Sequence, residues 1–301
     1  MRAAAIFGLG CSRKNLQPFQ HDPAIDWRIG LPAASKDVDA ILLFGGDGTI
    51  HRHLSQLVRL NRPVLIVPAG SGNDFARALQ IKSVRDAMAA WQNFCRSADN
   101  VREVDLGVIT SLDHGEPREP ALTRYFACVA GVGIDGEVAR RANELPRWLR
   151  GNGGYALSLL PSIFRFSPVS MKVNVPALSL TNGASEKREW STLSDQPTTL
   201  AAFANTSTYG GGMKIAPQAS MDDSLLDICL VRAVNRLKLF AVFPSVYAGR
   251  HLGIREVEYF QAPRVRVETG RPLDVYADGE FVCRTPIEVS VQPKALKVIT
   301  L

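Results

Sequence analysis

The stretch Phe44-Gly45-Gly46-Asp47-Gly48-Thr49 decides the fold. It follows the apolar run 38–44 (VDAILLF), which is short, continuous and bounded by turn residues. Such a run is typical of a strand buried on both faces of a parallel sheet. Behind the stretch, apolar residues recur at helical spacing from Ile50 to Leu60, with Thr49 as the expected N-cap. The six residues therefore form the corner between a buried strand and a helix.

This corner has the chemistry of a phosphate-binding loop. Gly45, Gly46 and Gly48 let the backbone turn tightly and let a ligand approach the amides closely. The helix start offers free N–H groups and the positive end of a dipole, and Thr49 adds a hydroxyl. The spacing matches neither a Walker loop nor GxGxxG, so a tight loop without a ligand explains the motif about as well.

A second glycine corner follows the next apolar run. Residues 63–67 (PVLIV) predict a strand, and residues 68–76 (PAGSGNDFA) come directly after it, with a helix expected to begin near Asn73. Alternating strands and helices indicate a parallel, right-handed α/β unit. Because both corners follow strands, we expect both at the carboxyl edge of the sheet, where such folds bind ligands.

The pattern changes after residue 101. Residues 135–166 look helical with breaks, residues 236–247 predict one more helix, and residues 181–198 predict a polar hairpin tip or loop. The rest is a series of short strands separated by turn residues, which is typical of an antiparallel sandwich. We therefore expect an α/β plus all-β protein with two domains. These are an α/β domain (1–105), completed by a C-terminal strand near 290–301, and a β-sandwich domain (106–289).

Composition narrows the function only slightly. The 301 residues carry a formal charge of +6, which suits nucleotide phosphates, anionic lipid surfaces or nucleic acid without choosing between them. No aromatic–basic module accompanies the charge, so we do not expect nucleic-acid binding. Five scattered cysteines without a CxxC indicate reduced thiols in a cytosolic protein. No apolar run approaches the ~18 residues of a transmembrane helix.

Taken together, six motifs resemble the catalytic family of diacylglycerol, sphingosine and ceramide kinases, in its branch of soluble bacterial lipid kinases. They stand in the family's order and cover most of the chain. They are FGGDGT (44–49), PAGSGNDFAR (68–77), VDLG (104–107), GVGIDGEV (131–138), NTSTYGGGMKIAPQASMDDSLLDI (205–228) and YADGE (276–280). The resemblance implies a two-domain kinase that uses ATP and Mg²⁺. Its first domain (1–105) would bind the nucleotide, its second domain (106–289) would bind the lipid substrate, and a cleft would lie between them.

The resemblance also implies roles for single residues. Gly45 to Thr49, with Ser71, Asn73 and Asp74, would hold the nucleotide, Asp47 would act through Mg²⁺ or orient the loop, and Glu280 would be the general base. A purely structural role stays open for four of them. Asp47 would then be a turn residue that bonds its own backbone, and Asn73 or Asp74 would cap the next helix. Glu280 would be an exposed strand residue after a turn at Asp278-Gly279.

A second site implied by the resemblance is a metal site away from the phosphates. There the carboxylate of Asp223 would join backbone carbonyls of Ser220 and Leu225 around Mg²⁺ or Ca²⁺. The alternative is an Asx-turn between strands. Ser224 stands where the family usually has glycine.

Two further features bear on the resemblance. Asp135 would lie near the substrate head group or cap the helix that follows. His51 and Arg52 replace the family's usual Asn-Glu, which puts the local charge in question and lets Arg52 contact phosphate instead.

The predicted function is an ATP-dependent lipid kinase that phosphorylates a hydroxyl of diacylglycerol or a related lipid. The alternatives are an inactive lipid- or nucleotide-binding regulator and a related kinase of a soluble substrate such as NAD. The expected partners are the lipid and an anionic membrane surface bound peripherally from the cytoplasm, and a homodimer is left open. The arginine-rich segment 137–150 is either a membrane-facing stretch or a solvated helix face.

Overall fold

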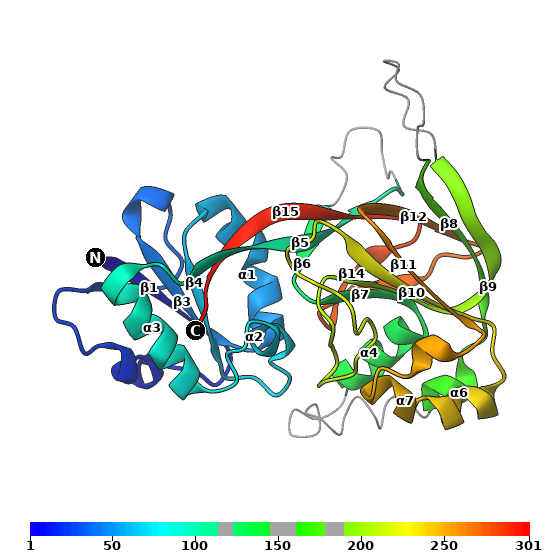
Figure 1. Cartoon of the computed structure of the whole chain (residues 1–301), viewed down its shortest axis with the longest axis horizontal. Helices are drawn as coiled ribbons and strands as arrows, with labels where there is room; N and C mark the ends of the chain where they lie inside the picture. Colours follow the sequence, from blue (N-terminus) through cyan, green and yellow to red (C-terminus); the bar gives the residue numbers. More distant parts are fainter. Residues whose placement is uncertain (114–122, 145–160, 178–189) are drawn as a thin grey trace, which may run out of the picture.

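The computed structural model describes residues 1–113, 123–144, 161–177 and 190–301. Figure 1 shows two domains side by side, with the N-terminus and the C-terminus both in the first. No helix in these four ranges is both long enough and apolar enough to cross a bilayer.

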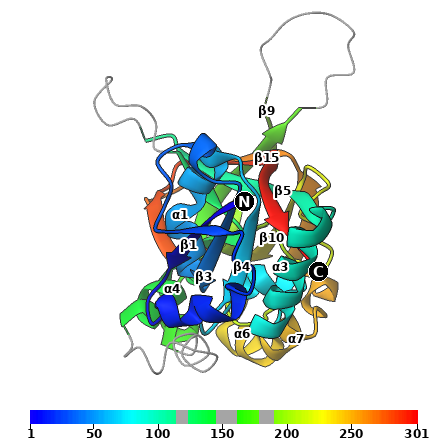
Figure 2. The ribbon, with the colours of Figure 1, turned by 90° about the vertical axis from the view of Figure 1, so that its left-hand side faces the viewer.

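The first domain is an α/β unit, as predicted. Its strands pair in parallel in the order β2-β1-β3-β4, and α1 and α3 flank them (Figure 2). The strands are β1 (Arg2–Phe7), β2 (Asp26–Ile29), β3 (Ala40–Gly45) and β4 (Val64–Pro68). The helices are η1 (Arg13–Phe19), η2 (Ser35–Asp37), α1 (Asp47–Leu60), α2 (Asp74–Ala78) and α3 (Val84–Ser97).

Strand β3 is the centre of this sheet. All six of its residues are buried, and β1 and β4 pair with its two edges. Helix α1 buries Ile50, Leu54 and Leu57 on one face and ends at Asn61, which adopts the left-handed conformation (φ 46°). The apolar pattern of the sequence thus places the glycine corner at the carboxyl end of the innermost strand.

The start of α1 differs from the prediction. Thr49 is not the N-cap, because the helix begins at Asp47 and its N-cap is Gly46. Glycine is acceptable at the N-cap, so the helix can start three residues earlier than expected. The Thr49 side chain packs instead where two glycines leave space. A Cβ on Gly8 would lie 2.3 Å from Thr49 Oγ1, and one on Gly45 would lie 2.6 Å from Thr49 Cβ.

The second domain is the predicted antiparallel β-sandwich, with a core of its own that includes Phe126, Phe203 and Val265. Its helices are α4 (Ile134–Glu144), α6 (Arg236–Val242), α7 (Pro244–Tyr247) and η4 (His251–Gly253). Its strands are β5 (Val101–Ser111), β6 (Thr123–Phe126), β7 (Val129–Gly133), β8 (Val169–Pro176), β9 (Trp190–Ala204), β10 (Leu226–Arg232), β11 (Val257–Ala262), β12 (Arg264–Thr269), β13 (Asp274–Ala277), β14 (Glu280–Arg284) and β15 (Ile287–Ile299).

Strands β5 and β15 form a two-stranded ribbon that joins the domains (Figure 1). The far end of β15 pairs in parallel with β4, through Val298 and Val64, so the last strand enters the first sheet. The ribbon changes register between Gln292 and Leu296. At this bulge the buried carboxylate of Asp105 accepts hydrogen bonds from the N–H groups of Lys294 (2.7 Å) and Ser224 (2.8 Å). The predicted boundary at residue 105 thus falls inside a continuous strand.

Two expectations about local structure need correction. The helix expected over residues 236–247 is divided into α6 and α7, because Pro244 has no N–H to continue the first helix. Residues 190–198 belong to β9 rather than to a loop, whereas 178–189 lie outside the described residues. Of the helical stretch expected over 135–166, residues 134–144 and 161–165 are helical and 145–160 lie outside the described ranges.

Candidate functional site

A cavity of about 380 Å³ lies between the two domains. Both glycine corners line it from the first domain, and the strand ends of the second domain line it from the other side. Six of its polar residues are Asp47, Thr49, Arg52, Asp135, Asp278 and Glu280. This cavity, here called the cleft, therefore brings together residues from five of the six motifs.

The two glycine corners touch each other. A Cβ on Gly70 would lie 2.5 Å from the Cα of Gly46, so any side chain at position 70 would collide with the first corner. The first turn of α1, at Asp47 and Gly48, has N–H groups without a helical partner. Backbone donors and a bare glycine surface are what a phosphate group requires. The residues present thus fit a nucleotide phosphate.

Asp47 ties the first corner to the second. Its half-buried carboxylate accepts hydrogen bonds from the N–H groups of Asp74 (3.0 Å) and Phe75 (3.1 Å), at the start of α2. Burial and the nearby charge of Asp74 raise the pKa of Asp47 to about 6, although these two N–H groups oppose the shift. In the described residues Asp47 therefore has an orienting contact, which is one of the two roles expected for it.

The other residues of the second corner have different surroundings. Asn73 adopts the left-handed conformation (φ 56°), and its amide exchanges hydrogen bonds with the backbone of Gly70 (2.8 and 2.7 Å). Asp74 is buried, and it accepts from Arg77 (2.8 Å) and from the N–H of Gly211 (2.9 Å) in the second domain. Ser71 is exposed and lines the cleft. Asn73 and Asp74 thus shape the loop, and Ser71 is open to a ligand.

Asp278 is the turn residue of the second-domain motif. It and Gly279 both have positive φ (51° and 85°), as a tight hairpin requires. Its carboxylate accepts from the N–H groups of Ala127 and Cys128, both at 2.8 Å. It also lies 3.3 Å from Nδ1 of His51 on α1. His51, which replaces the asparagine usual in the family, thus bridges the two domains. The sequence alone did not predict this contact.

This bridge predicts a pH-dependent stability. Burial alone would lower the pKa of His51, but the hydrogen bond and charge of Asp278 raise it above its ordinary value. The stabilisation is therefore complete below about pH 6.5 and is lost as the pH rises through the higher folded value. We expect His51→Gln to lower Tm by about 2–4 °C near pH 6 and by much less near pH 9. Differential scanning calorimetry measures this difference.

His53→Gln is the matched control, because His53 lies on the same helix and its Nδ1 lies 3.2 Å from Oε1 of Gln56, a neutral partner in the first domain. A loss of stability that is the same at both pH values would show that the His51–Asp278 contact is not charged.

Glu280 begins β14 and is exposed. Its Oε1 would lie 2.9 Å from a Cβ placed on Gly48, so its carboxylate reaches across the cleft to the first glycine corner. The geometry therefore puts an accessible carboxylate beside the predicted phosphate loop. Arg52, also exposed, lines the same cleft.

A narrow apolar cavity of about 80 Å³ adjoins the cleft. The two share Asp135 and Tyr209 as walls, and the Tyr209 hydroxyl donates to Asp135 (2.9 Å). Apart from these two residues, Thr199 and His251, the lining is aliphatic or aromatic, or the thioether of Met213. Asp135 therefore stands where a polar cleft meets an apolar cavity, as the resemblance implied for a head-group position.

The predicted metal site has weaker support in the geometry. Asp223 is exposed, and one oxygen accepts from the N–H of Leu225 (3.0 Å), which is an Asx-turn. Among the described residues no three His, Cys, Asp or Glu side chains gather to hold a metal. The backbone carbonyls of Ser220 and Leu225 would have to supply the other ligands, so the site stays a prediction. Ser224 has φ 61°, a conformation that favours glycine.

We expect a cation at this site to raise Tm in the parent and not in Asp223→Ala. A ligand at about 100 times its Kd stabilises the folded state by about 2.7 kcal/mol. Thermal unfolding with Mg²⁺ or Ca²⁺ tests this, with the neighbouring Asp222→Ala as control, since Asp222 pairs with Arg102. An equal response of parent and Asp223→Ala would reduce the site to a turn.

Two family models match the chain. Residues 20–109 match the diacylglycerol kinase catalytic domain, and residues 128–300 match the YegS C-terminal NAD kinase beta sandwich-like domain. The second model covers more than half of the chain. Both domains that the sequence resemblance implied are therefore confirmed at the level of the family.

Relatives and solved structures agree with this assignment. A protein of Mycobacterium tuberculosis named diacylglycerol kinase is 34% identical over 273 residues, which is 89% of this chain and 78% of the relative. A diacylglycerol kinase of Bacillus subtilis is 27% identical over 251 residues, or 83% and 73%.

Among solved structures, a diacylglycerol kinase of Bacillus anthracis shares the fold with a TM-score of 0.68 at 20% identity, covering 100% and 97% of the two chains. An NAD kinase of Archaeoglobus fulgidus shares it with a TM-score of 0.53 at 12% identity, covering 100% and 93%. With matches to both family domains and a 34% identical relative, the chain belongs to the diacylglycerol kinase family of lipid kinases.

Proposed function

We propose that the chain is an ATP-dependent kinase that transfers the γ-phosphoryl group to a hydroxyl of diacylglycerol or a related lipid. The observation that carries this proposal is the junction at Asp135 and Tyr209, where the polar cleft meets the narrow apolar cavity. A lipid has the same division, with a hydroxyl-bearing head and an apolar tail. A substrate that is polar throughout would leave the apolar cavity unused.

The first domain offers the nucleotide side of the site. The N–H groups at the start of α1 and the bare surfaces of Gly46, Gly48 and Gly70 fit the phosphates of ATP. Mg²⁺ bound with the nucleotide supplies neutralisation of the phosphate charge. Asp47 holds the second corner in place against the first, so that both present their backbone to the same group.

The second domain offers the acceptor side. The lipid hydroxyl oxygen would form a bond to the γ-phosphorus while the bond from that phosphorus to the β–γ bridging oxygen breaks, so that ADP leaves. Glu280, which is exposed beside Gly48, is placed to accept the hydroxyl proton. A base positioned in this way contributes on the order of 10²–10⁴ in rate.

Two other functions predict different results. Phosphorylation of NAD would need a polar acceptor site, and the NAD kinases share only the fold with this chain. A regulator without activity would bind lipid or nucleotide and transfer nothing. The presence of His51 and Arg52 in place of Asn-Glu is the feature that would favour such a regulator, but His51 has a structural role of its own in its contact with Asp278.

An assay with γ-labelled ATP tests the proposal. The full chain is incubated with Mg²⁺ and, in separate reactions, with diacylglycerol, sphingosine, ceramide and NAD, and the products are resolved by chromatography. We expect label in a lipid and none in NAD. Label only in NAD, or in no acceptor while ATP binds, would overturn the proposed function.

A further inference from the structure

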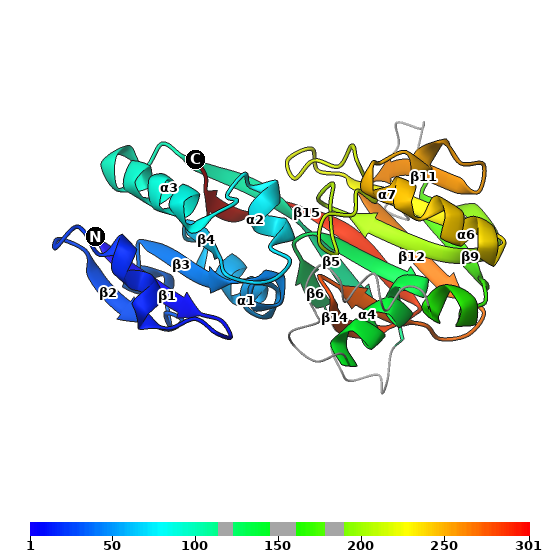
Figure 3. The same cartoon turned by 90° about the horizontal axis from the view of Figure 1, so that it is seen from below.

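Helix α6 has an unusual composition for a surface helix. Its seven residues read RLKLFAV, five of them apolar, yet none is buried. Leu237 is 71% exposed and Phe240, three residues later, is 49% exposed. A surface helix normally turns its apolar stripe towards the core. Leu239 packs against the core in this way, but Leu237 and Phe240 face outward. Figure 3 shows α4, α6 and α7 together on the side of the second domain that faces the viewer.

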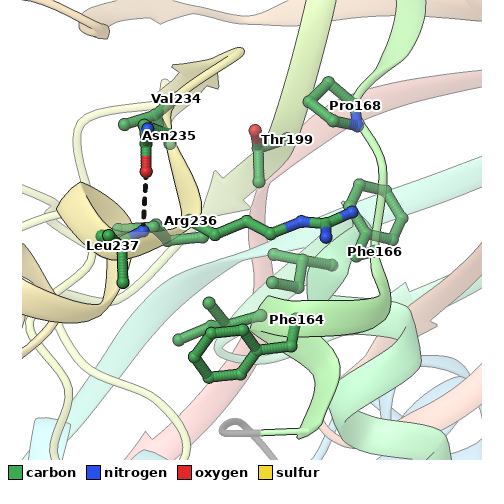
Figure 4. A pocket seen from close by; sticks show the side chains of 11 residues that line it. Phe164, Phe166, Pro168, Thr199, Val234, Asn235, Arg236 and Leu237 are labelled. Carbon is green, nitrogen blue, oxygen red and sulfur yellow. Dashed lines mark hydrogen bonds between the residues drawn. The ribbon is translucent and has the colours of Figure 1, made fainter.

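A groove of about 470 Å³ runs beside α6. Its opposite wall is the helical turn 161–165, where Phe164 is 49% exposed. Figure 4 shows the Arg236 side chain extending across the groove towards Phe166, with Phe164 on the other side. Exposed apolar side chains from two distant segments thus border one hollow.

The two chain segments that border this groove carry mainly positive charge. Residues 235–255 contain Arg236, Lys238, Arg250 and Arg255 and no Asp or Glu, although Lys238 pairs with Glu256 just beyond them. Residues 161–168 contain Arg165 as their one charged residue. Arg165 and the four cations just named are exposed. Exposed apolar side chains next to exposed cations, as at Phe164-Arg165 and Arg236-Leu237, fit a surface with an apolar interior and anionic head groups.

The groove is also continuous with the candidate lipid site. It shares the wall residues Ile134, Ile163, Thr199 and Leu239 with the narrow apolar cavity. That cavity reaches Asp135 at the cleft. The three hollows therefore follow one another from the α6 side of the domain to the glycine corners.

We infer that the α6 surface, defined as Phe164, Arg165, Arg236, Leu237 and Phe240, docks on an anionic phospholipid bilayer. The two Phe and the Leu enter the boundary between head groups and tails, and the arginines contact lipid phosphates. Docking in this orientation brings the groove to the membrane, so a lipid can leave the bilayer along an apolar path. The inference rests on the proposed function in this respect, that the substrate is a membrane lipid.

Vesicle co-sedimentation of the full chain tests the α6 surface. The vesicles are phosphatidylcholine with and without phosphatidylglycerol, and the test variant is Leu237→Ser with Phe240→Ser. We expect the parent to bind the anionic vesicles and the variant to bind at least about tenfold more weakly, because two apolar side chains no longer leave water. The matched control is Val84→Ser with Leu193→Ser, which removes two comparably exposed apolar residues elsewhere.

The charges have their own variant, Arg165→Gln with Arg236→Gln. Each arginine near an anionic membrane contributes about fivefold in affinity, so this variant should bind anionic vesicles more weakly and neutral vesicles unchanged. Raising the salt from about 0.1 M to about 1 M should weaken the parent's binding in the same way. Binding that ignores both salt and lipid charge would overturn the electrostatic part of the inference.

Three results would overturn the whole inference. These are a parent that ignores vesicles, a Leu237/Phe240 variant that binds like the parent, and a control pair that loses binding equally. A fourth would reassign the surface: a dimer in sedimentation without vesicles that the Leu237/Phe240 substitutions dissolve. If no lipid is phosphorylated but vesicle binding follows the α6 variants, the proposed function fails and the docking surface stands.

Discussion

Phosphorylation of lipid should fall by about 10²–10⁴-fold when Glu280 is replaced by Gln. Glutamine keeps the shape of the side chain but cannot accept a proton from the attacking hydroxyl. The loss should appear mainly in kcat, since the contact strengthens only as the proton moves. Nucleotide binding should change little, because the glycine corners belong to the other domain. Steady-state kinetics and calorimetric titration with ATP measure the two quantities.

The control is Glu268→Gln, an exposed glutamate on β12 outside the residues that line the cleft. Partial rescue of Glu280→Gln by high Mg²⁺ would point to a metal ligand in place of a base. The base role would be wrong if a stable Gln variant bound ATP normally and turned over lipid within a few-fold of the parent.

Replacing Asp47 by Ala should reduce turnover by about 10²-fold or more while the protein stays folded. Two N–H groups at the start of α2, those of Asp74 and Phe75, lose their acceptor. The second glycine corner is then free to shift relative to the first, and a displacement of about 1 Å near the reacting group can cost this much. ATP titration and turnover should both report the loss, with far-ultraviolet circular dichroism unchanged.

Asp86→Ala is the matched control, because Asp86 also accepts a backbone N–H, from Lys82 (2.9 Å), at the start of a helix outside the cleft. Near-normal turnover by a folded Asp47→Ala variant would contradict the assignment of the phosphate site.

We also expect Asp47 to make the free energy of unfolding depend on pH. Its pKa in the folded state is about 6, above the ordinary value for Asp, so the folded state binds its proton more tightly than the unfolded state. Its favourable contribution is therefore present below about pH 4 and is lost as the pH rises through about 6. The unfolding free energy of the parent minus that of Asp47→Asn should fall across this window. A difference that stays constant with pH would show that Asp47 titrates normally.

Much of the first domain could be predicted from the sequence. The apolar run 38–44 is typical of a strand buried on both faces, and two such strands in parallel bring their following glycine corners to one edge. The contact between Gly46 and Gly70 follows directly. The N-cap was wrong because Thr49 has the better capping side chain, whereas tertiary packing needs that side chain between Gly8 and Gly45.

Contacts between segments far apart in the chain could not be predicted from the sequence. His51 and Asp278 are 227 positions apart, and nothing local to either predicts the other. The same holds for Asp105, whose motif was recognised but whose two N–H donors lie near residues 224 and 294. The exposure of Leu237 and Phe240 on α6 could not be predicted, because a short helix with five apolar residues is typical of a buried helix.

The path of β15 has a consequence for how the protein is made. The side-chain amide of Asn100, directly before β5, donates to the carbonyl of Thr300 (2.6 Å), across 200 positions of the chain. During synthesis the first domain emerges long before the strand that completes its sheet. Until then β4 has an unpaired edge, which is a template for pairing with other chains. Newly made chains are therefore most exposed to aggregation, and to chaperones, before β15 leaves the ribosome.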